Sequence, residues 1–146
     1  MSTERTILLV EDNEDDVLLM KLALEEAGIS NTVHVVETVN HAIEYLSGNA
    51  RFSDRSTYPL PRVLFVDLLL PGRPGHDLLR WMQPREEFAD VVRAVVTGSV
   101  DPADMRTAYE LGANCYFQKP LTVERDRKST RLNSSHVTTS RMPSSA

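Results

Sequence analysis

Short, mostly apolar runs recur along the first 125 residues and alternate with longer segments of mixed character. The runs lack a strict alternation of apolar and polar positions, which is typical of strands buried on both faces in a parallel sheet. We therefore predict five strands, at residues 6–10, 32–36, 63–66, 91–97 and 114–118.

The segments between these runs have helical spacing and residues that suit helix ends. In the first of them, Asn13 suits the N-cap and Gly28 the position after the C-cap. The same segment places four apolar residues on one face, which are Met20, Ala23, Leu24 and Ala27. The polar stretch 49–62 contains two prolines and predicts a surface loop. The four predicted helices span residues 13–28, 40–48, 75–83 and 101–113.

Strands that alternate with helices along the chain indicate an α/β fold, in which a doubly wound parallel sheet carries helices on both faces. A further helix should follow the fifth strand. Its place is taken by residues 126–146, which are rich in serine and threonine and show no helical or strand periodicity. We therefore expect a domain over residues 1–125 that lacks its final helix.

The segment 126–146 is predicted to be disordered. Two of its stretches, "DRKSTRLNSSH" and "SRMPSSA", look like the translation of a sequencing adaptor. On this interpretation the segment is non-native read-through, and a genomic clone with the same codons would refute it. The alternative is an authentic polar tail.

Length, charge and cysteine content exclude several functional classes. The chain has 146 residues, which suits one domain. Its formal net charge of −5 gives no basic footprint for nucleic acid, and its single cysteine excludes a disulfide framework. No apolar run approaches the roughly 18 residues of a membrane helix, and the first residues do not resemble a signal peptide. We expect a cytoplasmic protein without a membrane or nucleic-acid partner.

Polar side chains follow four of the predicted strands. Glu11 and Asp12 follow the first, Asp67 the third, Thr97 closes the fourth, and Lys119 follows the fifth. Functional groups of such sheets collect beyond the carboxyl ends of the strands. Converging carboxylates suit a hard cation such as Mg²⁺, and a lysine with a hydroxyl suits a phosphoryl group. The set indicates a carboxylate nucleophile with a metal and a phosphate clamp.

Each of these residues also has a simpler interpretation. Acids after a strand can merely favour the start of a helix through its dipole. Thr97 can form a local turn between its hydroxyl and the backbone.

The motifs "LLVEDNEDD", "FVDLLLPG", "VVTGS" and "CYFQKP" resemble, in order and spacing, those of the response-regulator receiver domain of two-component systems. The resemblance covers essentially all of residues 5–125. It implies a flavodoxin-like sheet with strand order 2-1-3-4-5. The loop before Pro61 and the stretch "YELGANCYFQKP" also resemble the stand-alone regulators that are paired with phytochrome-like histidine kinases.

The resemblance implies that Asp67 is the phosphoacceptor, which takes a phosphoryl group from a kinase phosphohistidine. It also implies that Glu11 and Asp12 hold Mg²⁺, with Asp67 and the backbone carbonyl of Leu69 as further ligands. Leu69 is apolar at a position that borders the phosphoryl site, which we expect to alter the dephosphorylation rate.

The remaining roles also come from the resemblance. Lys119 would pair with phosphoryl oxygens, and Thr97 would bind the phosphoryl group and move toward it. Tyr116 matches the aromatic switch that turns inward when Thr97 moves, although a plain core tyrosine is an equal alternative. Pro120 matches a proline that often follows a cis peptide bond.

These roles predict a phosphorelay protein whose partner is a sensor histidine kinase, rather than an enzyme with a separate substrate. A homodimer is weakly supported, because the absent helix belongs to the usual dimer surface. A hydrolase of the haloacid-dehalogenase type would need an acid where Leu69 stands, and a nucleotide-binding protein would need a glycine-rich turn. A degenerate receiver that only docks to proteins remains the alternative.

Overall fold

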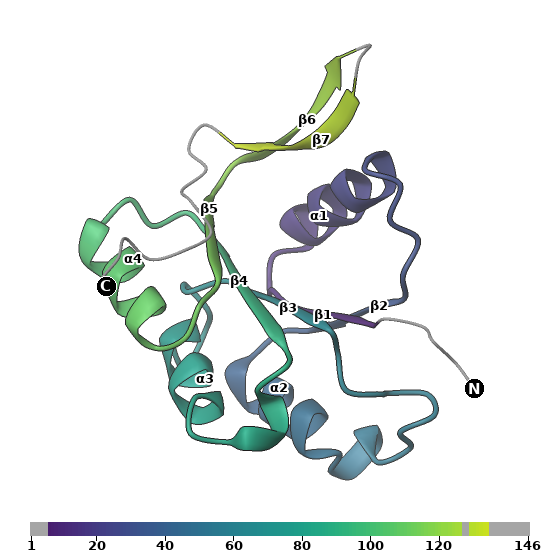
Figure 1. Ribbon diagram of the computed structural model, residues 1–146, viewed down its shortest axis with the longest axis vertical. Helices are drawn as coiled ribbons and strands as arrows, with labels where there is room; N and C mark the ends of the chain where they lie inside the picture. The colour runs from purple at the N-terminus through teal and green to yellow at the C-terminus, as the bar shows by residue number, and fades with distance from the viewer. Residues whose placement is uncertain (1–5, 127–128, 135–146) are drawn as a thin grey trace.

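The computed structural model describes residues 6–126 and 129–134 of the chain. Its centre is a five-stranded parallel sheet in the order β2-β1-β3-β4-β5 (Figure 1). The strands are β1 (Ile7–Val10), β2 (Val33–Val36), β3 (Val63–Val66), β4 (Val92–Thr97) and β5 (Cys115–Gln118). The predicted fold class, strand positions and strand order are confirmed.

Four α-helices connect these strands, and two short 3₁₀ helices, which the sequence did not predict, lie in the connections. They are α1 (Glu14–Glu26), α2 (Val39–Ser47), η1 (Ala50–Phe52), α3 (Gly75–Met82), η2 (Glu86–Phe88) and α4 (Pro102–Glu110). The predicted ends of the first helix are confirmed. Asn13 is its N-cap, where Oδ1 accepts from the Asp16 N–H at 2.9 Å, and Gly28 follows its C-cap at φ +80°.

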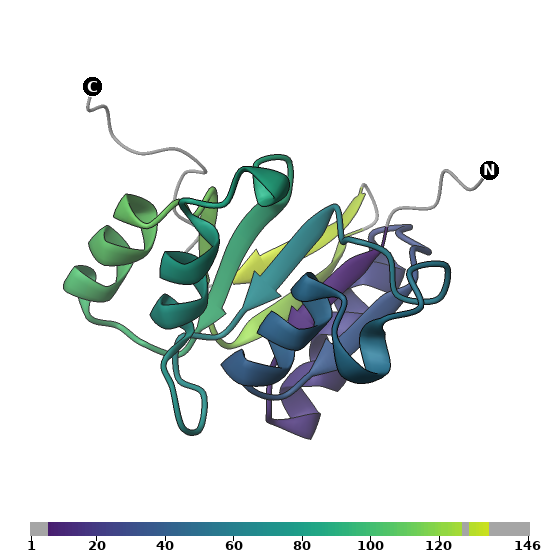
Figure 2. The same ribbon diagram turned by 90° about the horizontal axis from the view of Figure 1, so that it is seen from below.

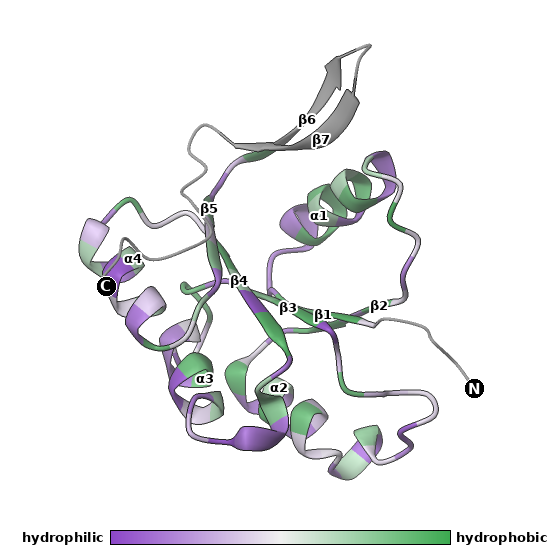
Figure 3. Cartoon of the chain, viewed as in Figure 1, coloured by the Kyte–Doolittle hydropathy of each residue, from purple (hydrophilic) through white to green (hydrophobic). Residues whose placement is uncertain are grey.

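Helices cover the two faces of the sheet unequally. Figures 1 and 2 show α2, α3 and α4 on one face and α1 on the other. Successive strand residues point to opposite faces, as in any pleated strand. Leu8 and Val10 therefore pack with α2, α3 and α4, whereas Ile7 and Leu9 pack with α1. Figure 3 shows the hydrophobic character of the strands that this burial on both faces requires.

The inward face predicted for α1 is confirmed for Met20, Ala23 and Leu24, which are buried. The prediction is wrong for Ala27, which is exposed. Ala27 is the C-cap, with φ −82° and ψ 2°, so the chain leaves the helical path at this residue. Its side chain therefore no longer follows the face that meets the sheet.

The segment 49–62 is more than a polar surface loop. Phe52 is buried, and its ring lies 5.0 Å from Tyr45 and 5.1 Å from Tyr58 between ring centroids. Arg55 donates hydrogen bonds of 2.7–2.8 Å to the backbone carbonyls of Tyr45, Leu46 and Tyr58. The loop is thus fixed to the end of α2 by an aromatic cluster and one guanidinium.

After β5 the chain forms an antiparallel hairpin of β6 (Leu121–Asp126) and β7 (Ser129–Ser134), which lies on the α1 side of the sheet (Figure 1). Leu121 is buried among the residues under α1, so it fixes the start of the hairpin. Among the described residues, no α-helix follows β5.

The disorder predicted from residue 126 therefore differs from the structure at residues 126 and 129–134, where paired strands satisfy the backbone groups of both segments. The rest of that prediction falls on residues 127–128 and 135–146, which lie outside the described residues. The domain boundary at residue 125 and the read-through origin of the segment stay predictions.

Candidate functional site

The carboxyl ends of β1, β3 and β5 meet at one edge of the sheet, and the residues that follow them continue its hydrogen bonding. The Glu11 N–H donates to the Val36 carbonyl at 2.9 Å, and the Asp67 N–H donates to the Val10 carbonyl at 3.1 Å. The Lys119 N–H donates to the Thr97 carbonyl at 2.8 Å. The backbone of each residue is therefore held by the neighbouring strand.

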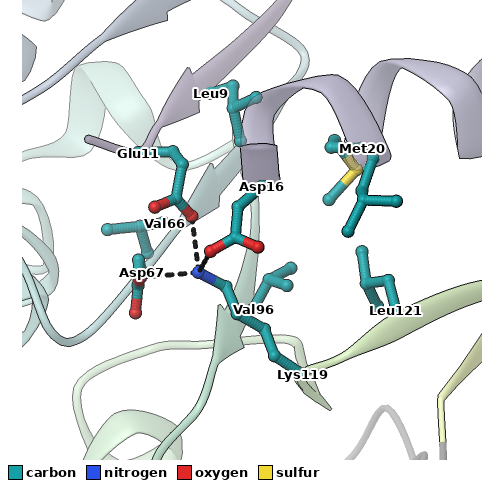
Figure 4. A pocket seen from close by; sticks show the side chains of 10 residues that line it. Leu9, Glu11, Asp16, Met20, Val66, Asp67, Val96, Lys119 and Leu121 are labelled. Carbon is teal, nitrogen blue, oxygen red and sulfur yellow. Dashed lines mark hydrogen bonds and ion pairs between the residues drawn. The ribbon is translucent and has the colours of Figure 1, made fainter. Parts of the chain in front are cut away.

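Lys119 brings the acidic side chains together. Its Nζ donates to Glu11 Oε1 at 2.8 Å, to Asp16 Oδ2 at 2.7 Å and to Asp67 Oδ2 at 2.8 Å (Figure 4). Burial alone would lower the pKa of Lys119. The hydrogen bonds to the three carboxylates outweigh burial and raise the pKa above its ordinary value, so the ammonium form is favoured. The peptide bond between Lys119 and Pro120 is cis, as predicted.

Glu11 is the most buried acid of the site, with 4% of its side chain exposed. Burial raises its pKa, since it penalises the carboxylate. Hydrogen bonds from Lys119 and from the Asn13 N–H oppose that shift without cancelling it. A cation beside Glu11 would act in the same direction as Lys119.

The residues fit a divalent cation. Oxygen atoms of Glu11, Asp12 and Asp67 lie within 4.8 Å of one another; Glu11 and Asp67 are buried and Asp12 is exposed. Three carboxylate oxygens open to solvent on one side are the hard ligands that Mg²⁺ and Mn²⁺ prefer. The Leu69 N–H donates to Asp67 Oδ1 at 2.9 Å, which places Leu69 beside the group. The predicted role of the Leu69 carbonyl stays a prediction.

Thr97 and Tyr116 are both buried behind this edge. The Thr97 hydroxyl accepts a 3.3 Å hydrogen bond from the Ser99 N–H, which is the local turn considered above. Tyr116 lies inside the core, with its ring 6.5 Å from that of Tyr109. Burial raises the pKa of the Tyr116 phenol. An inward tyrosine suits both a core residue and a switch, so the switch role stays a prediction.

Sequence reasoning missed two residues of the site. Asp16 was not among the predicted site residues, yet its carboxylate contacts Lys119. Gly75 follows Pro74 in "PGRPG", and its N–H donates to the Leu68 carbonyl at 3.0 Å. A Cβ on Gly75 would overlap the Asp67 carbonyl oxygen and lie 3.0 Å from Leu68 Cα. The first turn of α1 begins at the site, but it holds three acids, Glu14, Asp15 and Asp16, and the sequence does not single out Asp16.

A fold with this strand order and an acidic cluster at the carboxyl edge defines a class of signalling domain. The model of the response regulator receiver domain matches residues 7–131, so the chain belongs to that family. It is 34% identical over 118 residues to a probable methanogenesis regulatory protein, FilR2, of Methanothrix harundinacea, covering 81% of this chain and 74% of the relative.

One similar solved structure is described as a phytochrome response regulator, and another as a Mn²⁺-bound response regulator. The solved structure of the phosphorylated cyanobacterial phytochrome response regulator RcpA has a TM-score of 0.73 and 26% identity, covering 81% of this chain and 82% of that one. Response regulator Rcp1 of Synechocystis is 27% identical over 115 residues, covering 79% of this chain and 76% of the relative. Its Mn²⁺-bound form has a TM-score of 0.71 and covers 85% of this chain and 84% of that one.

Receiver domains bind Mg²⁺ or Mn²⁺ in an acidic pocket, and this chain has an acidic cluster, formed by Glu11, Asp12 and Asp67. Within the described part of the chain, no helix is both long enough and apolar enough to cross a membrane.

Proposed function

We propose that this chain accepts a phosphoryl group on Asp67 from a phosphohistidine of a sensor histidine kinase in the cytoplasm, and passes on a signal by changing conformation. The observation that carries this proposal is the contact of 2.8 Å between Lys119 Nζ and Asp67 Oδ2 at a buried acidic site. The chain then acts as a phosphoacceptor, not as an enzyme with a separate substrate.

In the proposed step, a carboxylate oxygen of Asp67 forms a bond to phosphorus as the bond between phosphorus and the imidazole nitrogen breaks. The electron pair of that bond stays on the imidazole, which takes up a proton from water. Both Asp67 oxygens are already oriented, Oδ1 by the Leu69 N–H and Oδ2 by Lys119. Such positioning supplies much of the rate in phosphoryl transfer.

Glu11, Asp12 and Asp67 would hold Mg²⁺. When bound, the cation would neutralise charge on the acidic cluster and on the phosphoryl oxygens. The chemistry of these residues supports the assignment, since three carboxylate oxygens gather within 4.8 Å of one another.

Thr97 and Tyr116 would convert the chemical event into a change of shape. Thr97 is fully buried at the end of β4, next to β5, which carries Tyr116. A movement of Thr97 toward the phosphoryl group would break its hydrogen bond with the Ser99 N–H and alter the packing around Tyr116. The kinase partner is proposed to be phytochrome-like, because RcpA is called a phytochrome response regulator.

The proposal is tested by incubating the chain with acetyl phosphate and Mg²⁺ and measuring its intact mass. One phosphoryl group should be added to the wild type and to Asp90→Asn, an exposed acid at the opposite end of β4. Asp67→Asn should take up none. A folded wild type that remains unmodified would instead favour the docking module, and phosphorylation of Asp67→Asn would place the acceptor elsewhere.

A further inference from the structure

We propose that Asp16 is a positioning residue, which holds the Lys119 ammonium in place while a cation occupies the acidic cluster. This inference rests on the proposed function, because it concerns the same phosphoryl-accepting site. It assigns a role to a carboxylate that belongs neither to the cluster around Asp67 nor to the strands of the sheet.

The first step of the argument is the number of donors on Lys119. An ammonium has three N–H groups, and those of Lys119 point at Glu11, Asp16 and Asp67. A phosphoryl oxygen can gain a hydrogen bond from Lys119 only when one of these three contacts is released. The identity of the contacts that remain decides where the ammonium sits during the reaction.

The second step is that a cation competes for two of the three partners. Glu11 and Asp67 belong to the carboxylates whose oxygens lie within 4.8 Å of one another, and Asp16 is outside that group. A cation bound there would attract the carboxylates of Glu11 and Asp67. It would therefore weaken their hydrogen bonds with the Lys119 ammonium. The contact with Asp16, at 2.7 Å, is the one that the cation leaves intact.

The third step is the fixed position of Asp16 itself. It lies in the first turn of α1, where its backbone N–H donates to the N-cap side chain of Asn13 at 2.9 Å. Its carboxylate contacts Lys119 in a pocket whose apolar walls include Leu9, Met20, Val96 and Leu121 (Figure 4). Contacts between ions are stronger beside apolar walls than in water.

Exposure distinguishes Asp16 from the other two partners. Its side chain is 31% exposed, compared with 4% for Glu11 and 6% for Asp67. Asp16 therefore pairs with Lys119 at little cost in desolvation.

The test compares Asp16→Asn with Asp15→Asn, an exposed acid of the same helical turn. Both variants remove one negative charge from the start of α1 and leave the N-cap hydrogen bond, which uses the backbone, intact. The rate of phosphorylation by acetyl phosphate at saturating Mg²⁺ should fall about tenfold in Asp16→Asn, as expected for the loss of one charge-assisted hydrogen bond. Asp15→Asn should match the wild type, and Asp16→Glu should recover part of the rate.

A second measurement separates positioning from a structural role. Hydrogen exchange of the Lys119 ammonium, followed by ¹⁵N NMR with Mg²⁺ present and assigned by the loss of its signal in Lys119→Arg, should be faster in Asp16→Asn than in Asp15→Asn. A tenfold lower rate with unchanged exchange would overturn the inference, as would equal rates in the two variants. Failure of the wild type itself to take up phosphate would count against the proposed function instead.

Discussion

Gly75 packs so closely against the backbone carbonyl of Asp67 that a side chain at this position would overlap the carbonyl oxygen. The contact involves the backbone of the proposed acceptor itself, and it lies where the loop after β3 leads into α3. A residue at the start of α3 therefore sets how closely the helix approaches the strand end that carries Asp67.

Gly75→Ala should destabilise the fold. The neighbours of the new methyl group are backbone atoms of Asp67 and Leu68, which cannot move aside as a flexible side chain can. Overpacking of this kind costs about 1–3 kcal/mol. Gly98→Ala is the matched control, since a Cβ there meets no atom within 4 Å. Denaturant unfolding should show a lower midpoint for Gly75→Ala only; equal midpoints would contradict the proposed contact.

The stabilisation of the protein by Mg²⁺ should depend on Asp12. Asp12 is exposed, so Asp12→Asn removes a ligand without leaving a buried group unpaired. A ligand at about a hundred times its Kd stabilises the folded state by about 2.7 kcal/mol. Thermal unfolding should show this gain with Mg²⁺ in the wild type and in Asp90→Asn, and a much smaller gain in Asp12→Asn. An identical gain in all three would argue against a site built on Asp12.

Glu11 should make the stability of the metal-free protein depend on pH. Its pKa in the folded state is raised above 4.5, because it is buried. The folded state therefore binds the Glu11 proton more tightly than the unfolded state, so the contribution of Glu11 is full below pH 4.5 and is lost as the pH rises through the folded-state pKa.

Unfolding in the presence of a chelator, at a series of pH values, checks this sign. Glu11→Gln should remove the decline that the wild type shows above pH 4.5, whereas Glu14→Gln, at an exposed position of α1, should keep it. A wild type that gains stability from Glu11 over that range would show that the contact with Lys119 outweighs burial.

Arg55→Ala should loosen the loop after α2. It leaves the carbonyls of Tyr45, Leu46 and Tyr58 without the guanidinium that now donates to them. We expect a loss of about 2 kcal/mol in the free energy of unfolding, because three partly buried carbonyls each lose a hydrogen bond to a charged group, and of these the Tyr45 carbonyl keeps the Gly48 N–H as a donor. Arg106→Ala, on the exposed side of α4, should change the stability little. Hydrogen exchange of the segment 49–62 should rise in Arg55→Ala alone.

Much of the fold could be predicted from the sequence, because buried strands and helix ends can be recognised from short stretches of residues. The run Val63–Val66 has no polar residue to place on a solvent face, so it predicted a buried strand, which is β3. Asn13 and Gly28 predicted the ends of α1 through the backbone geometry that each residue favours. The residues at the strand ends were accessible for a similar reason, since parallel strands bring their carboxyl ends to one edge.

What escaped prediction depends on contacts between distant segments. The partners Asp16 and Lys119 are 103 positions apart, and neither strand nor helix periodicity says which acid of the first turn of α1 the ammonium meets. Phe52 lies in a polar stretch, and its burial follows from rings supplied by α2 and the loop. The hairpin of β6 and β7 carries no periodic pattern that we could recognise, because its pairing is a property of two strands together.

The hydrogen bonds from the Glu11, Asp67 and Lys119 amides to neighbouring strands make the alignment of the sheet a condition for the chemistry. If β3 slipped by one residue against β1, Val66 or Leu68 would take the place of Asp67, and every side chain of β3 would turn to the opposite layer of helices. Evolution can therefore exchange one apolar residue of these strands for another far more easily than it can insert or delete one.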